Sequence, residues 1–320
     1  MMTQDQLVVA GIDVAKDKID ACIRTVTERK TCPATAAGRR SLIVWLRKHR
    51  VGKAVMEASG GYERIWAKAL RQAGLEVRIV DPKRVRHFAE SAGRLAKNDK
   101  IDAEMICWFA ETFSEAPSQV DNPAQEEIKA LVKGRQSLID VRARLEMQKE
   151  HDAPALLRKA RARLLRKLAD EIAAIETVIA AMIKAMPDFA RRAEIIQSVP
   201  GFAEGTAMAL LGGLPELGQV SDEVAAALMG VAPYDDDSGK RRGERCIKGG
   251  RRWVRNALYM PCVGAATLNN PVFKAFYERL TAKGKPPKVA IVACMRKLII
   301  ILNTMIARDE TWDPKKYRVA

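Results

Sequence analysis

The order of strand-like and helix-like segments in the first hundred residues constrains the fold most. Two strands joined by a tight polar connection at residues 16–18 are predicted by LVVAGIDVAKDKIDACIRTV, and TERKTCPAT can add a third. A helix (AAGRRSLIVWLRKHR), a short strand (GKAVMEASG), a second helix (YERIWAKALRQAG) and a further strand (LEVRIVDP) follow. Strands in succession, then strands alternating with helices, predict a mixed α/β domain.

A mostly helical segment completes this domain, with a break expected near Lys97–Asn98. The composition then changes at SEAPSQVDNPAQ, which is rich in Pro, Ser, Asn and Asp and predicts a hinge. From Glu126 to about Met186, helix breakers are few and apolar residues recur every three or four positions. This pattern predicts two long helices, bent near residues 152–154, in an antiparallel or intermolecular coiled coil.

A third, largely helical block begins near Ala190. We therefore expect three parts, at residues 1–118, 119–189 and 190–320. Within the third part, IIQSVPGFAEGTAMALL resembles a helix-hairpin-helix segment in which Pro200–Gly201 and Gly205 form the hairpin. Its backbone N–H groups could grip a phosphate at a helix start. An ordinary glycine turn between two core helices is the structural alternative.

The charge balance indicates a polyanionic partner. The chain has 320 residues with 55 Lys and Arg against 39 Asp and Glu, a formal charge of +16. Such a basic chain typically meets nucleic acid, because each cation brought to a phosphate releases a condensed counterion. A chain that is merely basic is the alternative.

Cysteine spacing and hydropathy exclude several other classes. The six cysteines include no C-x-x-C pair, which argues against a zinc module and against a disulfide framework. The N-terminus lacks the features of a signal peptide. The late apolar run VAIVACMRKLIIILNTMIA has Arg296 and Lys297 at its centre and predicts a buried core helix rather than a membrane span. We expect a cytoplasmic protein.

Four acidic residues occupy positions that suit a metal site. Asp13 ends the first predicted strand, Glu57 ends a later one, and Asp99 and Asp102 lie three apart on one helical face. Carboxylate oxygens that converge from separate rigid elements are what a hard cation needs, so one or two Mg²⁺ ions are expected here. Taken singly, a strand-end Asp is usually a turn residue and an i,i+3 pair is usually a solvated helix face.

A serine lies between acidic and basic residues in APYDDDSGKRRGERCIKGGRRWVRNAL. The Ser238 hydroxyl could be a nucleophile if a turn at Gly239 places it and nearby cations hold a phosphate. The cations of this cluster are Lys240, Arg241, Arg242, Arg245, Lys248, Arg251, Arg252 and Arg255. Simple contacts to a nucleic-acid backbone are the alternative. The acids Asp235–Asp237 could restrain the basic segment or position Ser238. The sequence favours neither role over the other.

These segments carry a family resemblance. GIDVAKDKIDACI, VMEASGGYERIW and AKNDKIDAEMICWFA resemble the RuvC-like, RNase H-type domain of the DEDD insertion-sequence transposases. MGVAPYDDDSGKRRGERCIKGGRRWVRNALYM resembles the C-terminal domain of the same family, in the same order and after a helical stretch. The resemblance implies an acidic tetrad of Asp13, Glu57, Asp99 and Asp102, and a catalytic serine at Ser238.

The resemblance also implies an activity and partners. Members of this family carry out site-specific DNA recombination that inserts and excises the mobile element encoding them. They resemble recombinases guided by a non-coding bridge RNA that pairs with double-stranded donor and target DNA. Dimers that assemble into a tetramer are implied as well.

A chemical scheme joins the two motifs. Ser238 would attack a phosphodiester and form a phosphoserine link to DNA, assisted by Mg²⁺ at the tetrad, and a freed hydroxyl would later reverse the step. One alternative is a RuvC-like endonuclease or junction resolvase in which water attacks. Another is a non-catalytic scaffold that only binds nucleic acid.

Overall fold

The computed structural model describes residues 8–94, 99–113, 123–150, 154–237 and 243–316. The chain divides into two compact units, Met1–Val120 and Asp121–Ala320. The helical stretch after residue 122 is thus grouped with the C-terminal residues, and the division at residue 189 stays a prediction.

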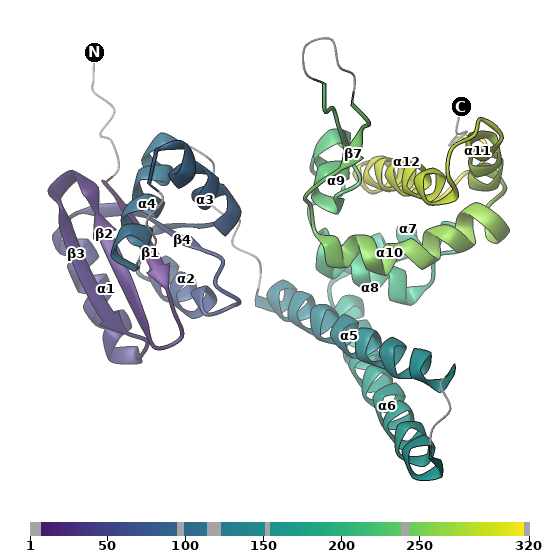
Figure 1. The fold of residues 1–320 in the computed structure, drawn as a ribbon, viewed down its shortest axis with the longest axis horizontal. Helices are drawn as coiled ribbons and strands as arrows, with labels where there is room; N and C mark the ends of the chain where they lie inside the picture. Colours follow the sequence, from purple (N-terminus) through teal and green to yellow (C-terminus); the bar gives the residue numbers. More distant parts are fainter. Residues whose placement is uncertain (1–7, 95–98, 114–122, 151–153, 238–242, 317–320) are drawn as a thin grey trace. The chain divides into compact units, whose positions relative to one another are not determined.

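The first unit is built on a five-stranded mixed sheet (Figure 1). Its strands are β1 (Val8–Val14), β2 (Lys18–Ile23), β3 (Glu28–Pro33), β4 (Val51–Glu57) and β5 (Glu76–Val80), in the order β3-β2-β1-β4-β5. The pairs β1–β2 and β2–β3 are antiparallel, whereas β1–β4 and β4–β5 are parallel. The predicted mixed α/β arrangement is confirmed.

Helices cover both faces of this sheet. The helices α1 (Ala36–Lys48) and α2 (Glu63–Gln72) pack on one face, where Leu42 and Trp66 join a core with Ile12 and Met56. The helices α3 (Pro82–Ser91) and α4 (Asp99–Thr112) pack on the other, where Phe109 lies among Val55, Val80 and Val85. The predicted break at residues 97–98 falls between α3 and α4 and lies outside the described residues.

A close backbone contact in this unit joins α4 to β1 at Gly11. A Cβ atom on Gly11 would lie 2.3 Å from both the carbonyl oxygen of Ala103 and the backbone nitrogen of Cys107. Farther along, the Cys107 thiol lies 3.4 Å from the carbonyl oxygen of Val9. Moving back along β1 from Gly11 therefore means moving forward along α4, so the helix runs antiparallel to the strand. Its first turn lies toward the C-terminal end of β1.

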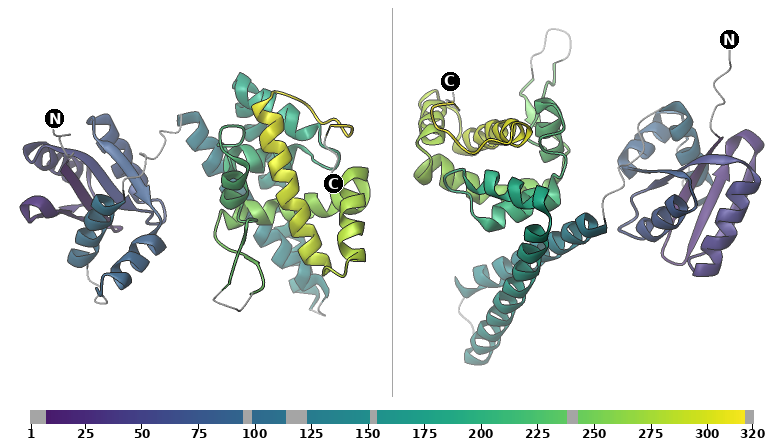
Figure 2. Two further views of the ribbon diagram at one scale, coloured as in Figure 1. Left: turned by 90° about the horizontal axis from the view of Figure 1, so that it is seen from above. Right: turned by 180° about the vertical axis from the view of Figure 1, so that it is seen from behind.

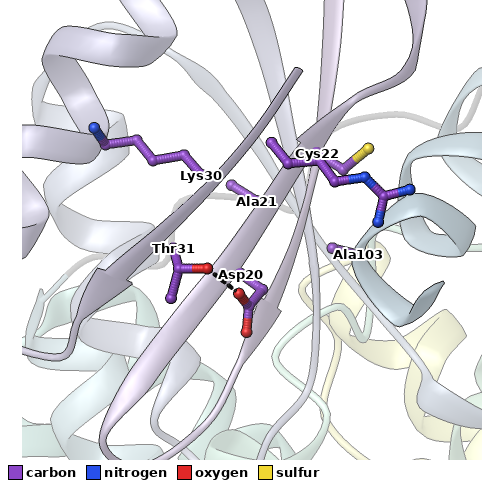
Figure 3. A pocket seen from close by; sticks show the side chains of 7 residues that line it. Asp20, Ala21, Cys22, Lys30, Thr31 and Ala103 are labelled. Atoms are coloured by element: carbon purple, nitrogen blue, oxygen red, sulfur yellow. Dashed lines mark hydrogen bonds between the residues drawn. The ribbon is translucent and has the colours of Figure 1, made fainter. Parts of the chain in front are cut away.

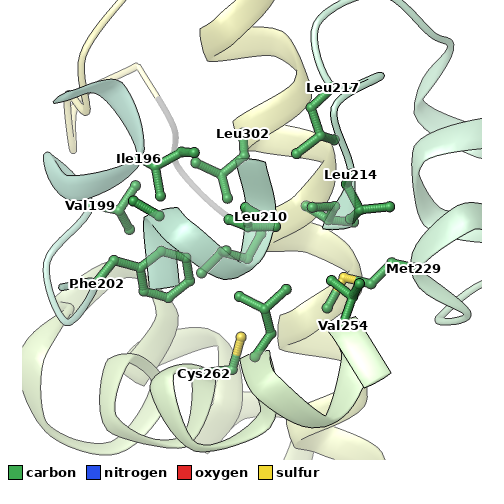
Figure 4. Close-up of a cluster of buried hydrophobic side chains, with 14 of the residues drawn as sticks. Ile196, Val199, Phe202, Leu210, Leu214, Leu217, Met229, Val254, Cys262 and Leu302 are labelled. Carbon is green, nitrogen blue, oxygen red and sulfur yellow. The ribbon is translucent and has the colours of Figure 1, made fainter. Parts of the chain in front are cut away.

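The second unit is mostly helical. Two long helices, α5 (Pro123–Met147) and α6 (Ala155–Ala185), pack against each other. The remaining α-helices described are α7 (Pro187–Gln197), α8 (Glu204–Gly213), α9 (Asp222–Met229), α10 (Arg252–Gly264), α11 (Pro271–Ala282) and α12 (Pro287–Ala307). They share one hydrophobic core, with Leu210 and Leu302 fully buried inside it (Figure 4).

The apolar helix α12 lies along the other helices of this core (Figure 2). By length and composition it could cross a membrane, but 56% of its most apolar window is buried within the unit, as in a soluble core helix. Asn303 is a buried polar residue of this helix. Its side-chain amide accepts a hydrogen bond from the Gly218 N–H and donates hydrogen bonds to the Val220 carbonyl oxygen and the Asp222 carboxylate. The loop before α9 is therefore fixed to α12.

Only part of α6 is buried against its neighbours. Leu165, Ile172 and Ile179 are buried and lie seven residues apart, as in one seam of a coiled coil. Leu157 and Leu164 lie on a different side and are each 55% exposed. The pairing of α5 with α6 is observed, while a coiled coil in the strict sense stays a prediction.

We expect Gly11→Ala to destabilise the first unit, because the added methyl group would overlap backbone atoms of α4 that cannot rotate away. Overpacking of this kind costs about 1–3 kcal/mol. Hydrogen exchange of the α4 amides should rise accordingly. Gly134→Ala is the control: this glycine lies within α5 with open space around it, so the change should stabilise the helix by about 0.5–1 kcal/mol. Unchanged exchange in α4 of Gly11→Ala would contradict the packing argument.

Candidate active site

One row of polar side chains crosses the sheet of the first unit. Asp13 on β1 is the direct partner of Asp20 on β2, and Asp20 is the partner of Thr31 on β3. On the other side of β1, Ile12 is in register with Met56. The next position along both parallel strands therefore sets Asp13 beside Glu57. Neighbouring strands lie about 5 Å apart, so these four side chains form a continuous row.

The row projects toward the face that α3 and α4 cover. Side chains alternate between the two faces of a strand, so Asp13 shares a face with Gly11, which contacts α4. The first turn of α4 lies toward this end of β1, and Asp102 precedes the contact residue Ala103. Asp13, Glu57 and Asp102 thus lie toward the C-terminal end of β1, beside the first turn of α4, and each is half-buried. The backbone of Asp99 begins α4, but its side chain lies outside the described residues.

The donor set suits a hard divalent cation. Asp13, Glu57 and Asp102 offer only carboxylate oxygens, from two strands and one helix, which is the ligand type that Mg²⁺ and related ions prefer. Among the side chains that the structure describes, no three Asp, Glu, His or Cys residues form a group arranged to hold a metal ion. The residue types and the strand register fit a metal, whereas the described side chains do not form a ligand set by themselves. The complete set of four, which includes Asp99, stays a prediction.

The turn that follows Glu57 is held by a buried acid. Glu63 is 7% exposed, and its Oε2 accepts hydrogen bonds from the N–H groups of Ser59 (3.0 Å) and Gly61 (2.8 Å). Gly60 and Gly61 have positive φ angles of 68° and 110°, which glycine adopts without steric cost. Glu63 thereby fixes the chain directly after a candidate ligand. This role of Glu63 was not predicted from the sequence, because it depends on hydrogen bonds formed around the folded turn.

A small pocket of about 90 Å³ lies beside the polar row (Figure 3). Its lining residues are Asp20, Ala21, Cys22, Arg29, Lys30, Thr31 and Ala103. Burial raises the pKa of the Cys22 thiol, and it raises the pKa of the nearby Cys107 thiol to about 12. Both thiols therefore stay protonated near neutral pH and are poor nucleophiles. Carboxylate chemistry, rather than thiol chemistry, characterises this corner.

The described residues before and after residues 238–242 are the two arms of a hairpin in the second unit. Its arms are β6 (Pro233–Tyr234) and β7 (Cys246–Ile247), which pair antiparallel. Beyond them, Arg245 Nε lies 2.5 Å from Asp235 Oδ1, and the Gly243 N–H donates to Asp237 Oδ1 at 3.1 Å. These contacts hold the two arms together on either side of residues 238–242. Four predicted site residues lie outside the described residues: Ser238, Lys240, Arg241 and Arg242.

Two glycines bring the base of this hairpin together. Gly230 and Gly250 have φ angles of 77° and 68°, and a Cβ atom on Gly250 would lie 2.2 Å from the Gly230 nitrogen. The Arg251 N–H also donates to the Leu228 carbonyl oxygen at 2.7 Å. These backbone groups lie too close together to admit a side chain. Their contacts fix the point where the hairpin leaves the helical core.

The described members of the basic cluster fall into two groups. The first is engaged with protein: Arg251 makes a bidentate pair with Glu216 at 2.7 and 2.5 Å, Arg255 donates to the Gly230 carbonyl oxygen at 2.7 Å, and Arg245 pairs with Asp235. The second comprises Lys248 and Arg252, which are exposed. Their positions make these two the better candidates for nucleic-acid contact, while such contact by any of the cluster stays a prediction.

The candidate helix-hairpin-helix is a turn between α7 and α8. Gly201 has a φ angle of 96°, and a Cβ atom there would lie 3.2 Å from the Ala265 Cα. Almost all of α8 is buried. The turn thus packs against the helical core, as expected for an ordinary glycine turn between two core helices. Phosphate binding by this turn stays a prediction.

Two family models match this chain. Residues 10–151 match the DEDD model of the IS110 group, described as a transposase, and residues 193–278 match a model described as "Transposase IS116/IS110/IS902 family". The first match contains all four acids of the predicted tetrad and the second contains Ser238.

Several curated proteins are similar over nearly the whole chain. The pilin gene-inverting proteins of Moraxella lacunata and Moraxella bovis are 29% and 28% identical to it, over 95% of this chain and 97% of theirs. The transposase for insertion sequence element IS1111A of Coxiella burnetii is 22% identical, over 95% of this chain and 91% of its own. The resemblance found in the sequence is confirmed: the chain belongs to the IS116/IS110/IS902 family of transposases, which are DNA-recombining enzymes.

Proposed function

We propose that this chain cuts and rejoins DNA with Ser238 as the nucleophile and with Mg²⁺ held by Asp13, Glu57, Asp99 and Asp102. The observation that carries the metal half is the strand register, which sets Asp13 beside Glu57 on the face where α4 begins. The sheet order, with an antiparallel β1–β2–β3 meander followed by parallel β4 and β5, is consistent with an RNase H-like domain.

The reaction begins with attack of the Ser238 oxygen on a DNA phosphorus atom. An O–P bond to serine forms, the P–O3′ bond breaks, and the serine proton leaves while the 3′-oxygen gains one. A bound Mg²⁺ would polarise the phosphate and stabilise the charge on the leaving oxygen. After strand exchange, a free 3′-hydroxyl attacks the phosphoserine and restores the serine. The number of phosphodiester bonds is conserved, so no high-energy cofactor is needed.

Contacts across the hairpin support a positioning role for the aspartates before Ser238. Asp235 binds Arg245, and Asp237 accepts the Gly243 N–H. Both acids are thus neutralised or hydrogen-bonded within the hairpin, which lowers their repulsion of an incoming phosphate. Of the two roles left open by the sequence, these contacts favour a structural support of the segment that holds Ser238.

The enzyme acts on DNA, and we propose that a bridge RNA pairs with donor and target DNA to select the sites. The net charge of +16 and the exposed Lys248 and Arg252 support binding of polyanions. Movement of a mobile element is the first candidate outcome. The similarity to pilin gene-inverting proteins favours a second, the inversion of a DNA segment, which uses the same cleavage and rejoining steps. A cytoplasmic location is part of this proposal.

We also propose a homo-oligomer, a dimer that assembles into a tetramer. The exposed Leu157 and Leu164 on α6 lie seven residues apart, and Leu168 continues the same side half-buried. Apolar residues at this spacing on a solvent-facing helix are typical of a coiled-coil seam.

Ser238→Ala should abolish the covalent protein–DNA adduct and lower recombination by about 10³-fold or more, because the hydroxyl nucleophile is removed. The measurement is adduct formation on a suicide DNA substrate, followed by gel electrophoresis. Ser137→Ala, on an exposed part of α5, should behave like the unmodified protein. Persistence of the adduct in Ser238→Ala would refute the serine mechanism, and hydrolysed ends without any adduct would favour the endonuclease.

Arg252→Ala should weaken DNA binding and reduce the slope of log K against log salt by about one, without lowering thermal stability. Arg251→Ala should instead lower thermal stability by about 1–3 kcal/mol, because Glu216 and the Gly213 carbonyl oxygen lose their partner. Calorimetry and salt-dependent binding curves give both values. The division of the cluster is wrong if Arg251→Ala melts normally and Arg252→Ala binds DNA normally.

Leu164→Lys should shift the protein toward the monomer in light scattering, since a charge would enter the proposed seam. Ala162→Lys adds the same charge at an exposed site two residues away, which is nearly the opposite side of the helix. It should leave the oligomeric state unchanged. Equal behaviour of the two variants would argue against this seam.

A further inference from the structure

The buried carboxylate of Asp20 has no part in the mechanism described so far. Asp20 is 8% exposed, although acidic side chains are seldom buried without a partner. It lies directly opposite Asp13 in the antiparallel pair of β1 and β2. Directly opposite residues project to the same face, so the two carboxylates are neighbours within the polar row.

Both oxygens of Asp20 are engaged. The Thr31 hydroxyl donates to Oδ1 (Figure 3). Lys18 Nζ lies 3.1 Å from Oδ2. Thr31 lies on the neighbouring strand, while Lys18 begins β2 with a side chain that is 46% exposed. The hydrogen bond fixes the direction of the carboxylate, and the ion pair partly compensates its charge.

The ion pair with Lys18 offsets only part of the repulsion between Asp20 and Asp13, and a metal cation bound at Asp13 would remove it. Like charges directly opposite each other destabilise a strand pair, and Asp13 lies between Asp20 and Glu57 in the row. A divalent cation at Asp13 would reverse the sign of the effect, since each nearby carboxylate then attracts it. The Lys18 ammonium group acts in the opposite direction, because it repels such a cation.

We propose that Asp20 is a positioning residue of the metal site: its fixed charge beside Asp13 strengthens divalent-cation binding, and Lys18 limits that binding. This inference rests on the proposed function, because it requires a metal at Asp13. It gives the two partners of one ion pair opposite effects on divalent-cation affinity. A purely structural role for Asp20, as a link between β2 and β3, makes no such distinction.

The test measures metal affinity in the full-length chain without DNA. Mn²⁺ is the probe, titrated by electron paramagnetic resonance with Mg²⁺ as competitor. Asp20→Asn keeps an acceptor for Thr31 and removes the charge, and it should weaken Mn²⁺ binding about 10- to 100-fold. Lys18→Met should strengthen binding about two- to tenfold. Thr31→Val should weaken binding, and Thr31→Ser should restore it.

A matched control is Lys16→Met, which removes the same charge from an exposed position in the same turn. It should change Mn²⁺ affinity less than Lys18→Met does. Unchanged affinity in Asp20→Asn, or weaker binding in Lys18→Met, would overturn the inference. If Asp20→Asn fails to fold, as judged by circular dichroism, Lys18→Met alone decides, because its side chain is largely at the surface.

Asp13→Asn separates the failure of this inference from the failure of the proposed function. If Asp13→Asn leaves Mn²⁺ binding unchanged, the metal site itself is wrong. If Asp13→Asn loses Mn²⁺ while Asp20→Asn and Lys18→Met bind it like the unmodified protein, only the role of Asp20 is wrong.

Discussion

The contact between Gly11 and the backbone of α4 is the constraint on which the candidate site depends. Because glycine has no Cβ, α4 lies directly on β1, with Ala103 and Cys107 against the strand. This contact fixes both the position and the direction of the helix. Asp102, which is about ninety residues from Asp13 in sequence, is thereby brought toward the end of β1. If the helix lay farther from the strand, the acids would lie apart, and each would be an isolated charge at the surface.

Much of the first unit could be predicted from the sequence, because its strands and helices have distinct periodicities. The acids at strand ends were also recognisable. Asp20 and Glu63 were not, since their significance depends on partners across the sheet and around a turn. In KIDACI, alternation places Asp20 on the face opposite Ile19 and Ala21, which resembles a solvated face. Only the packing of α4 shows that this face is covered.

The basic segment illustrates a different limit of sequence reading. Eight cations within sixteen residues predict a polyanion site, but composition does not tell a structural arginine from a binding one. Arg251 donates a hydrogen bond to Glu216, which lies 35 residues earlier in the sequence. Arg255 donates a hydrogen bond to a backbone carbonyl group at the end of α9. Both partners are brought near by the folding of the helical core. The charge available to a ligand is therefore smaller than the count of cations suggests.

The amide of Asn303 has a consequence for how the C-terminal unit reaches a single native arrangement. Besides Arg296 and Lys297 at its centre, α12 has apolar residues on several sides, so a rotated helix could still bury aliphatic surface. Rotation by one position, about 100°, would strand the amide in hydrocarbon without its three partners, at a cost of about 1–3 kcal/mol. The aliphatic residues thus drive the burial of this helix, and the Asn303 amide helps to select its orientation.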